Sequence, residues 1–434
     1  MSIDSESKPL FSTGHDGSVF EFVGQFNEET LDEFLIWCTE KRVSDITLQS
    51  DVVAWGKVGG KWQRLTTRRI NHDDMYRVVV AVYGQNGPGE VNSGHDLDPL
   101  YEIRDPNGVG RYSFRVNVTG GRLENGRGYQ VTIRTLPSEP IKLELLGIED
   151  DIVKAFRPEQ GLNLITGPTG SGKSTLLSSL IRNHCEREDV SDKVIEYSRP
   201  IEYVYDGLHF PHSFVFQTEV GQHLRDRYGD DSEMSDWAYA ARNALRRAAD
   251  IIVIGEARDA ATIRGCMTLA STGHLSMSTM HTIGVAETIR RALMVFPGNE
   301  QHGVAIDLLE CLNLVVTQLL IPKIGGGMVG CREYLVFDAK IRTRLSYMPI
   351  TEWPQTIREI LQARTSIGSS MEDSARQLHK EGKITAETFE YIAQRSSSES
   401  EVTRKASLFK PDTAETSPLS GFAQTVTSSV SEAR

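Results

Sequence analysis

The sequence is poor in cysteine, with only five among 434 residues, all far apart. No two of them form a C-x-x-C pair, which excludes a zinc site or a redox motif of that type. Scattered thiols also argue against a disulfide framework and fit a reducing, cytosolic compartment best. The five are Cys38, Cys185, Cys266, Cys311 and Cys331.

Long apolar runs are missing as well. A spanning helix needs about 18 uninterrupted apolar residues, and the most apolar stretch, Leu312 to Pro322, is too short. It is also interrupted by Asn313, Thr317 and Gln318. The first residues, MSIDSE, hold no basic segment followed by an apolar one, so we expect no secretory signal. The sequence therefore predicts no transmembrane segment, and it shows no internal repeat.

Basic residues are in deficit. Lys and Arg number 47 against 59 Asp and Glu, a formal net charge of −12. An acidic total disfavours a protein whose main partner is nucleic acid, although a local basic groove is compatible with it. We therefore expect no direct nucleic-acid contact. The length and an apolar fraction of 39% predict about two or three globular domains with a large core.

One motif stands out against these absences. Residues 167–175 read GPTGSGKST and match the phosphate-loop pattern G-x-x-x-x-G-K-[ST] without departure. An apolar strand, 162–166, leads in, and a helical stretch, 176–181, leads out. Glycines let backbone N–H groups turn toward phosphate, and the helix N-terminus adds a favourable dipole. The predicted nucleotide-binding residues are Gly167, Pro168, Thr169, Gly170, Ser171, Gly172, Lys173, Ser174 and Thr175.

This loop predicts ATP and Mg²⁺ as cofactors. Lys173 is expected to reach the β- and γ-phosphates, and Ser174 is expected to ligate Mg²⁺. Residues 250–256, DIIVIGE, supply a buried strand that ends in Glu256. Such a strand carries a Mg²⁺-linked acid in phosphate-loop folds, so we predict Ser174 and Glu256 at the metal. Alone, the pattern also fits a core strand followed by a surface acid.

Two histidines flank a strand rich in hydroxyl groups, GHLSMSTMHT, at residues 273–282. A neutral imidazole at His274 or His281 could sense the loss of the γ-phosphate. The spacing alone also fits two hydrogen-bonded polar residues at strand ends. With no cysteine or acid nearby, the pair is a poor metal site, and none is predicted there.

Arginines cluster in the N-terminal part, with five inside 24 residues. Arginine suits bidentate phosphate contact, including contact across a subunit boundary. A solvated strand face accounts for the cluster equally well. The five are Arg111, Arg115, Arg122, Arg127 and Arg134.

The N-terminal part is predicted to be a small mixed α/β domain. Helical periodicity covers 27–41, where Leu31, Phe34, Leu35 and Cys38 share a face. A second helix is predicted at 75–83. Predicted strands are 45–48, 52–58, 62–65, 111–118 and 129–136, with a hairpin at Gly59-Gly60 and a Gly/Arg-rich loop at 119–128.

From about residue 143 the pattern becomes apolar strands alternating with helices, which is typical of a parallel sheet. Predicted strands are 162–166, 193–197, 251–255 and 275–280, and predicted helices lie near 306–315 and 374–379. The predicted organisation is a flexible tail at 1–20, an N-terminal domain at 21–136, a linker at 137–142, an ATPase domain at 143–395 and a disordered Ser-rich tail at 396–434.

Four stretches together resemble the secretion-ATPase superfamily that includes the retraction ATPases of type IV pili. They are 111–117 with 133–137, the phosphate loop, 244–246 with 254–259, and 272–282 with 295–297. Within that family the chain is most similar to the DotB/TraJ-like ATPases of type IVB secretion and conjugal transfer. It lacks the four-cysteine element and the long N-terminal extension of the type II secretion and pilus-extension branch.

The resemblance implies a PAS-like α/β domain followed by a RecA-like phosphate-loop ATPase domain with a mainly parallel sheet. It implies a homohexameric ring, cytoplasmic and peripheral at the inner membrane, that works with inner-membrane and cytoplasmic components of a secretion or pilus machine. It assigns catalytic roles to Glu256, Glu202, His274 and His281. It also assigns a catalytic role to Arg115, Arg122, Arg127 and Arg134, which would supply positive charge from the N-terminal domain, in part across the subunit boundary.

One segment departs from the family pattern. The acidic box usually reads close to E-D-P-I-E, whereas this chain has SRPIE at 198–202. Only Glu202 remains in register, and Glu196 is a candidate substitute because residues two apart on a strand share a face. We expect Glu256 to be the principal acid, with Glu202 assisting.

Three other functions remain compatible with these residues. The altered acidic box fits a nucleotide-gated assembly module with little turnover. A DNA-transfer motor would require salt-sensitive DNA binding. An unrelated phosphate-loop kinase would show an acceptor site in place of the histidine motif.

Overall fold

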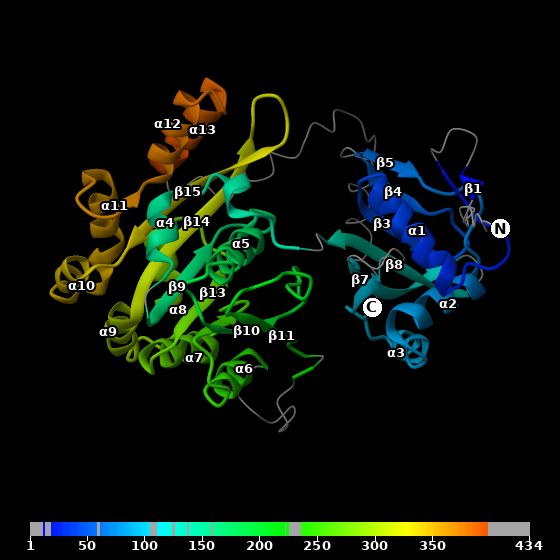
Figure 1. Cartoon of the computed structure of the whole chain (residues 1–434), viewed down its shortest axis with the longest axis horizontal. Coiled ribbons are helices and arrows are strands. Elements are labelled where there is room, and N and C mark those ends of the chain that lie inside the picture. The colour runs from blue at the N-terminus through cyan, green and yellow to red at the C-terminus, as the bar shows by residue number, and fades with distance from the viewer. Residues whose placement is uncertain are drawn as a thin grey trace, which may run out of the picture. The chain divides into compact units, whose positions relative to one another are not determined.

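The computed structural model describes two large β-sheets, each covered by helices, and a two-stranded sheet of β1 and β2 (Figure 1). The described residues are 12–13, 19–58, 61–104, 111–123, 126–136, 139–157, 159–221, 223–224 and 236–397. Most of the predicted tails at 1–20 and 396–434 and part of the predicted linker lie outside these ranges. The domain boundaries therefore stay a prediction.

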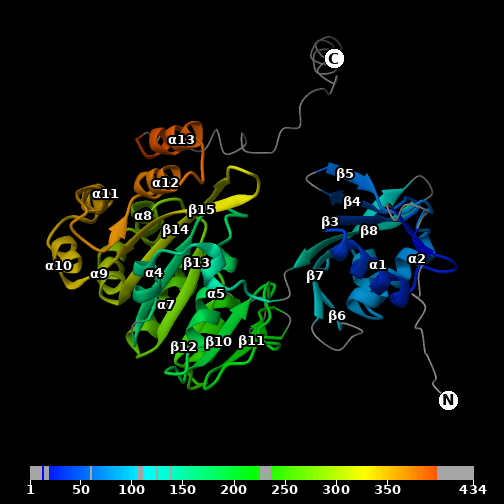
Figure 2. The same ribbon diagram turned by 45° about the horizontal axis from the view of Figure 1, so that its top comes forward.

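The first sheet has six strands, in the order β5-β4-β3-β8-β7-β6, and is antiparallel throughout. Helices α1, Glu28–Glu40, and α2, His72–Tyr83, contribute its apolar core (Figure 2). Asn27 and Asn71 begin these helices by accepting a backbone N–H bond with their side chains. The strands are β3 Val43–Gln49, β4 Trp55–Val58, β5 Lys61–Arg64, β6 Leu100–Arg104, β7 Arg111–Leu123 and β8 Gly126–Leu136; β1 Ser12–Thr13, β2 Phe20–Glu21 and α3 Gly87–Asn92 complete this part.

Both predicted helices and the predicted strand pairs of this part are confirmed, but the predicted loop at 119–128 is wrong. Strands β7 and β8 stay paired up to Leu123 opposite Gly126. Gly128 provides space, because a Cβ there would lie 2.2 Å from the side chain of Leu123, whereas Gly126 has a positive φ of 131° and faces open space. Glycine in a strand can mark a close approach, which the sequence pattern does not separate from a loop.

The second sheet has eight strands, in the order β11-β10-β12-β13-β9-β14-β15-β16. Neighbouring strands from β11 to β14 are parallel, and β15 and β16 add an antiparallel edge. Every residue of β9, β12 and β13 is buried, as expected for strands covered on both faces. The strands are β9 Gly161–Thr166, β10 Lys193–Ser198, β11 Phe214–Glu219, β12 Ile251–Ile254, β13 Leu275–Met280, β14 Leu312–Pro322, β15 Met328–Val336 and β16 Gly368–Ser369.

Helices cover both faces of this sheet. One apolar core joins it to α4 and α5, and a second joins its other face to helices α6 to α11. The short elements η1, Leu143–Leu146, and η3, Ile350–Glu352, are 3-10 turns. The helices are α4 Asp150–Ala155, α5 Lys173–Cys185, α6 Asp236–Ala244, α7 Ala260–Ser271, α8 Val285–Met294, α9 Gln301–Cys311, α10 Ala339–Ser346, α11 Trp353–Ala363, α12 Met371–Lys380 and α13 Ala386–Ser397.

The four predicted parallel strands and the helix at 374–379 are confirmed, with slightly different ends. The predicted helix at 306–315 is wrong in its second half, because α9 ends at Cys311 and β14 begins at Leu312. A short apolar run cannot be assigned to helix or strand by periodicity, and here pairing of β14 with β9 decides. Among the described residues, no helix has the length and apolar character to cross a membrane.

Candidate functional site

The phosphate loop lies at the carboxyl end of β9, between the parallel strands β13 and β14, and leads directly into α5 (Figure 1). Because β9, β10, β12 and β13 are parallel, the segments that follow them emerge at the same edge of the sheet. Glu202 follows β10, Glu256 follows β12 and His281 follows β13. The topology thus gathers three of the predicted catalytic side chains around the loop.

Backbone geometry explains the glycines of the loop. Gly167 has a φ of 143°, a conformation that L side chains rarely adopt, and a Cβ there would lie 2.3 Å from the Gln318 carbonyl oxygen. Gly170 also has a positive φ, of 78°, but faces open space. Gly167 therefore permits close packing of the loop against β14, and Gly170 supplies only a turn.

Lys173 is buried at the first turn of α5. Its ammonium group donates hydrogen bonds to the carbonyls of Gly167, at 2.9 Å, and Pro168, at 3.0 Å. Burial lowers the pKa of Lys173, whereas the nearby carboxylates of Glu256 and Glu202 raise it. The cation thus lies inside the loop and close to both predicted acids.

Glu256 is mostly buried and lies between two nitrogen donors. His281 Nε2 is 3.1 Å from its Oε1, and Arg258 Nε contacts the same oxygen. Burial and the positive charge of Lys173 lower the pKa of His281 from its ordinary value of 6.5, with Glu256 opposing. A neutral His281 at pH 7 can donate from Nε2 to Glu256.

The residues present fit a magnesium ion. The hydroxyl of Ser174, half-buried in the first turn of α5, has no hydrogen-bond partner among the described residues. Glu256 retains its second carboxylate oxygen, because both recorded contacts involve Oε1. Hydroxyl and carboxylate oxygens are the ligands that Mg²⁺ prefers. Ser174 and Glu256 would hold the ion beside the phosphates.

The altered acidic box has its own hydrogen-bond network. Glu196 accepts from the Ser198 hydroxyl at 2.5 Å and from Gln217 Nε2 at 2.9 Å. Burial raises the pKa of Glu196, those two hydrogen bonds lower it, and the nearby Glu202 raises it. Gln217 also donates to the carbonyl of Tyr203, at 2.7 Å. Glu196 therefore supports the segment that carries Glu202, and both its oxygens are already engaged.

The structure places the two predicted histidines at opposite edges of the sheet. His274 precedes β13, and its carbonyl accepts from the N–H of Gly161, where β9 begins. The phosphate loop follows the other end of β9. His274 therefore lies at the edge of the sheet opposite the phosphate loop of its own subunit, whereas His281 lies at the same edge as that loop. The order along the chain carries a signal for this, because His274 precedes its predicted strand and His281 follows it, and residues that follow parallel strands share one edge of the sheet.

The arginines lie on the β7–β8 hairpin in two cross-strand pairs, Arg115 opposite Arg134 and Arg122 opposite Arg127. Arg115 and Arg122 are seven residues apart, so the two pairs project to opposite faces. Like charges directly opposite each other are destabilising. Partners partly offset this repulsion: Arg134 pairs with Asp45 at 2.8 Å, and Arg127 donates to a backbone carbonyl. Arg115 and Arg122 are exposed, and Arg115 has no side-chain partner among the described residues.

Sequence reasoning missed a chain of threonine hydroxyls beneath the loop. Thr282 is 2.7 Å from Thr288, which donates to Thr166 at 3.3 Å. Thr166 is in turn 2.7 Å from Thr317. The chain ties the segment after His281 to the end of β9. The sequence carries no local signal for it, because the four threonines come from separate segments of the chain.

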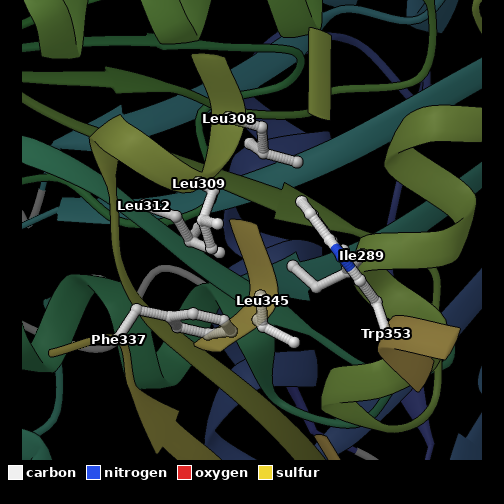
Figure 3. A pocket seen from close by; sticks show the side chains of 7 residues that line it. All are labelled: Ile289, Leu308, Leu309, Leu312, Phe337, Leu345 and Trp353. Atoms are coloured by element: carbon white, nitrogen blue, oxygen red, sulfur yellow. The ribbon is translucent and has the colours of Figure 1, made fainter. Parts of the chain in front are cut away.

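An apolar cavity also occurs in this part of the chain, lined by side chains that include Leu308, Phe337 and Trp353 (Figure 3). It offers neither a polar group nor space for a water molecule. Leu312, which also lines it, pairs with Leu162 near the start of β9. The cavity thus lies at the edge opposite the phosphate loop, and we assign it no function.

Comparison with known proteins agrees with this geometry. Residues 109–408 match the family described as Type II/IV secretion system protein. A curated relative, the type IV pilus retraction ATPase PilT of Pseudomonas aeruginosa, is 33% identical over 312 residues, which is 71% of this chain and 83% of that protein.

Two solved structures are also similar. The structure of the ATPase DotB of Legionella pneumophila matches with a TM-score of 0.73 at 36% identity. The match covers 86% of this chain and 98% of the DotB chain. The structure of the pilus retraction motor PilT with bound ADP matches with a TM-score of 0.68 at 30% identity. That match covers 83% of this chain and 96% of the PilT chain. The predicted fold class, a PAS-like α/β domain followed by a RecA-like ATPase domain with a mainly parallel sheet, is thereby confirmed.

Proposed function

Because this chain belongs to the Type II/IV secretion system protein family, we propose that it is an ATPase that powers a secretion or pilus machine. The observation that carries the proposal is the convergence of Lys173, Glu256 and His281 on one phosphate loop. A cation for the phosphates and an acid that can organise Mg²⁺ or the attacking water recur in sites that hydrolyse ATP to ADP and phosphate, and the imidazole of His281 adds a group beside that acid.

Each side chain has a distinct role in the proposed reaction. Lys173 leaves the carbonyls of Gly167 and Pro168 and binds the β- and γ-phosphates. Ser174 and Glu256 would hold Mg²⁺, which would supply positive charge to offset the negative charge that develops on the transferred phosphoryl group. Glu256 positions the attacking water, assisted by Glu202, and His281 holds Glu256 through Nε2 while responding to the γ-phosphate.

The arginine hairpin supplies further positive charge. Arg115 and Arg122 suit this role, because both are exposed and have no side-chain partner among the described residues, whereas Arg134 is already paired with Asp45; Arg115 is taken for the test. We propose that the chain assembles as a homohexamer in which the hairpin of one subunit completes the site of another. ATP then holds two rigid domains closed, and hydrolysis releases them.

The similarity to DotB and to PilT supports a place at the cytoplasmic side of the inner membrane, in a type IVB secretion, conjugal-transfer or type IV pilus machine. The alternative is a nucleotide-gated assembly module with little turnover. The observation in its favour is that Ser198 and Arg199 stand where the family has acids, while Glu196 has both oxygens engaged.

Phosphate release by the full-length protein tests the proposal. Lys173→Ala removes the ammonium group that lies inside the loop, so turnover should fall to background while thermal unfolding shows a folded protein. Wild-type turnover in folded Lys173→Ala would contradict the assignment. ATP binding by the wild type without measurable turnover would favour the assembly module.

Mixed assemblies test the composite site. Arg115→Ala should bind ATP and fail to hydrolyse it, since a trans arginine contributes about 10³-fold or more in well-studied phosphate-loop enzymes. Combining Arg115→Ala with Lys173→Ala subunits should restore part of the activity, because one intact site forms where the two meet. No recovery at any ratio, in rings shown to be mixed, would mean that Arg115 acts within its own subunit or only in folding.

A further inference from the structure

Two buried polar side chains in the middle of an apolar sheet have no part in the proposed reaction. Gln318 on β14 and Arg332 on β15 are 4% and 3% exposed and pair directly across the two strands. Arg332 Nε donates to Gln318 Oε1 at 2.7 Å, and Gln318 Nε2 donates to the carbonyl of Ser171 at 2.7 Å. The phosphate loop is thus tied to Arg332 through one amide.

The guanidinium of Arg332 continues the connection on its other side. It donates to the carbonyls of Leu146 and Gly147, both at 3.2 Å, and pairs with Glu149 at 3.1 Å. These acceptors end η1 and precede α4, shortly after the chain enters this part of the molecule. Its backbone N–H also bonds to the Ser374 hydroxyl, at 2.9 Å, at the start of α12.

Space for this network is provided by glycines. A Cβ at Gly172 would lie 2.9 Å from Gln318 Nε2, and a Cβ at Gly330 would lie 2.4 Å from Arg332 Nη2. Stability alone is a poor reason for such a network, because buried ion pairs replaced by apolar side chains often leave stability unchanged or raised. What the network does fix is the orientation of the peptide group between Ser171 and Gly172 in the phosphate loop.

The direction follows from the geometry of the peptide bond. A trans peptide places its C=O and N–H antiparallel, so holding the Ser171 carbonyl toward Gln318 points the Gly172 N–H away from it. Backbone N–H groups of such loops bind phosphate. The amide of Gln318 can satisfy both neighbours in only one orientation, since a donor must face Ser171 and an acceptor must face Arg332.

We propose that Gln318 and Arg332 are positioning residues for ATP turnover: they aim the Gly172 amide and link the phosphate loop to residues 146–149. The inference rests on the proposed ATP site and adds that the loop and the segment entering the ATPase domain move together. A phosphate that pulls on the loop displaces Gln318, then Arg332, and then the carbonyls of Leu146 and Gly147.

The test uses Gln318→Glu in the full-length protein. The carboxylate still accepts from Arg332 but faces the Ser171 carbonyl with an oxygen in place of a donor, so only the link to the loop is broken. Asn313→Asp is the matched control: its amide lies on the same strand at the opposite edge, and donates to Ala155 and Asn163 at 2.8 and 2.7 Å. Both variants replace a partly or fully buried amide donor by a carboxylate.

We expect kcat of Gln318→Glu to fall on the order of 10²-fold through misplacement of the loop, and Asn313→Asp to lose thermal stability with unchanged kcat and KM. Hydrogen exchange at 143–149 should respond to a non-hydrolysable ATP analogue in the wild type and in Asn313→Asp, but not in Gln318→Glu. Arg332→Lys keeps the positive charge beside Glu149 and loses the hydrogen bond to Gln318, so it should also lose the exchange response to the ATP analogue. This variant replaces Gln318→Glu as the test if Gln318→Glu does not fold.

Unchanged kinetics in Gln318→Glu, or an exchange response retained in both Gln318→Glu and Arg332→Lys, would overturn the inference while leaving the ATP site intact. Absence of nucleotide binding by the wild type would refute the proposed function, and the inference with it.

Discussion

Replacing Gly167 by alanine tests whether the loop needs the path that the structure gives it. The new Cβ would lie 2.3 Å from the Gln318 carbonyl oxygen and 2.5 Å from Ser171 Oγ, both closer than real Cβ contacts. The carbonyl cannot retreat freely, because its strand pairs with β9 up to Thr317 opposite Thr166. The loop must therefore take another path.

The backbone strain adds to this clash. A residue in a conformation that only glycine adopts readily costs about 1–3 kcal/mol, which corresponds to roughly 5- to 150-fold in an equilibrium constant. With the clash added, we expect ATP binding by Gly167→Ala to weaken by more than about 100-fold.

Gly170→Ala is the matched control, because Gly170 also has a positive φ but no atom within 4 Å of its added Cβ. Its cost is strain alone, about 1–2 kcal/mol, or roughly tenfold in binding. Titration with a fluorescent ATP analogue measures both variants, with thermal unfolding as a check of folding. Equal binding by the two folded variants would refute the argument from close packing.

The remaining predictions concern the acids and His281. Glu256→Gln should lower phosphate release by about 10²- to 10⁴-fold, the usual contribution of a positioned acid or base, while ATP binding persists. Normal turnover in Glu256→Gln would show that another group positions the water. Glu202→Gln should lower phosphate release by a smaller factor. Burial and Lys173 lower the pKa of His281, so wild-type turnover should be level from pH 8 to 7 and decline only below its ordinary value of 6.5. Because the folded state disfavours the proton, acid should also weaken folding in that range. In His281→Asn the acid decline of turnover should disappear, and an unchanged pH profile would assign it to a different group.

Much of the fold and of the site follows from local sequence patterns. The phosphate loop is a contiguous motif, so its backbone requirements lie within nine residues. The strands of the parallel sheet are predictable for a similar reason, since burial on both faces demands continuous apolar runs. The helix after Asn27 is signalled by its cap and by a single apolar face.

Long-range pairing decided what local patterns could not. The end of α9 and the start of β14 depend on β9, which lies about 150 residues earlier in the chain, as the contact between Thr166 and Thr317 shows. The same holds for the β7–β8 hairpin, where a glycine-rich segment that resembles a loop forms paired strands and Gly128 leaves room for the side chain of Leu123.

The candidate site shows the same division. The sequence by itself determined that a phosphate loop, an acid at Glu256 and two strand-flanking histidines are present, because each is encoded by neighbouring residues. With the sheet predicted to be parallel, the order along the chain also separates His281, which follows its strand, from His274, which precedes it. Only the tertiary structure decided that His281 meets Glu256, because β13 lies next to β12, and that Gln318, an interruption in an apolar run, contacts the loop. Strand order brings distant residues together, and it is not encoded in spacing along the chain.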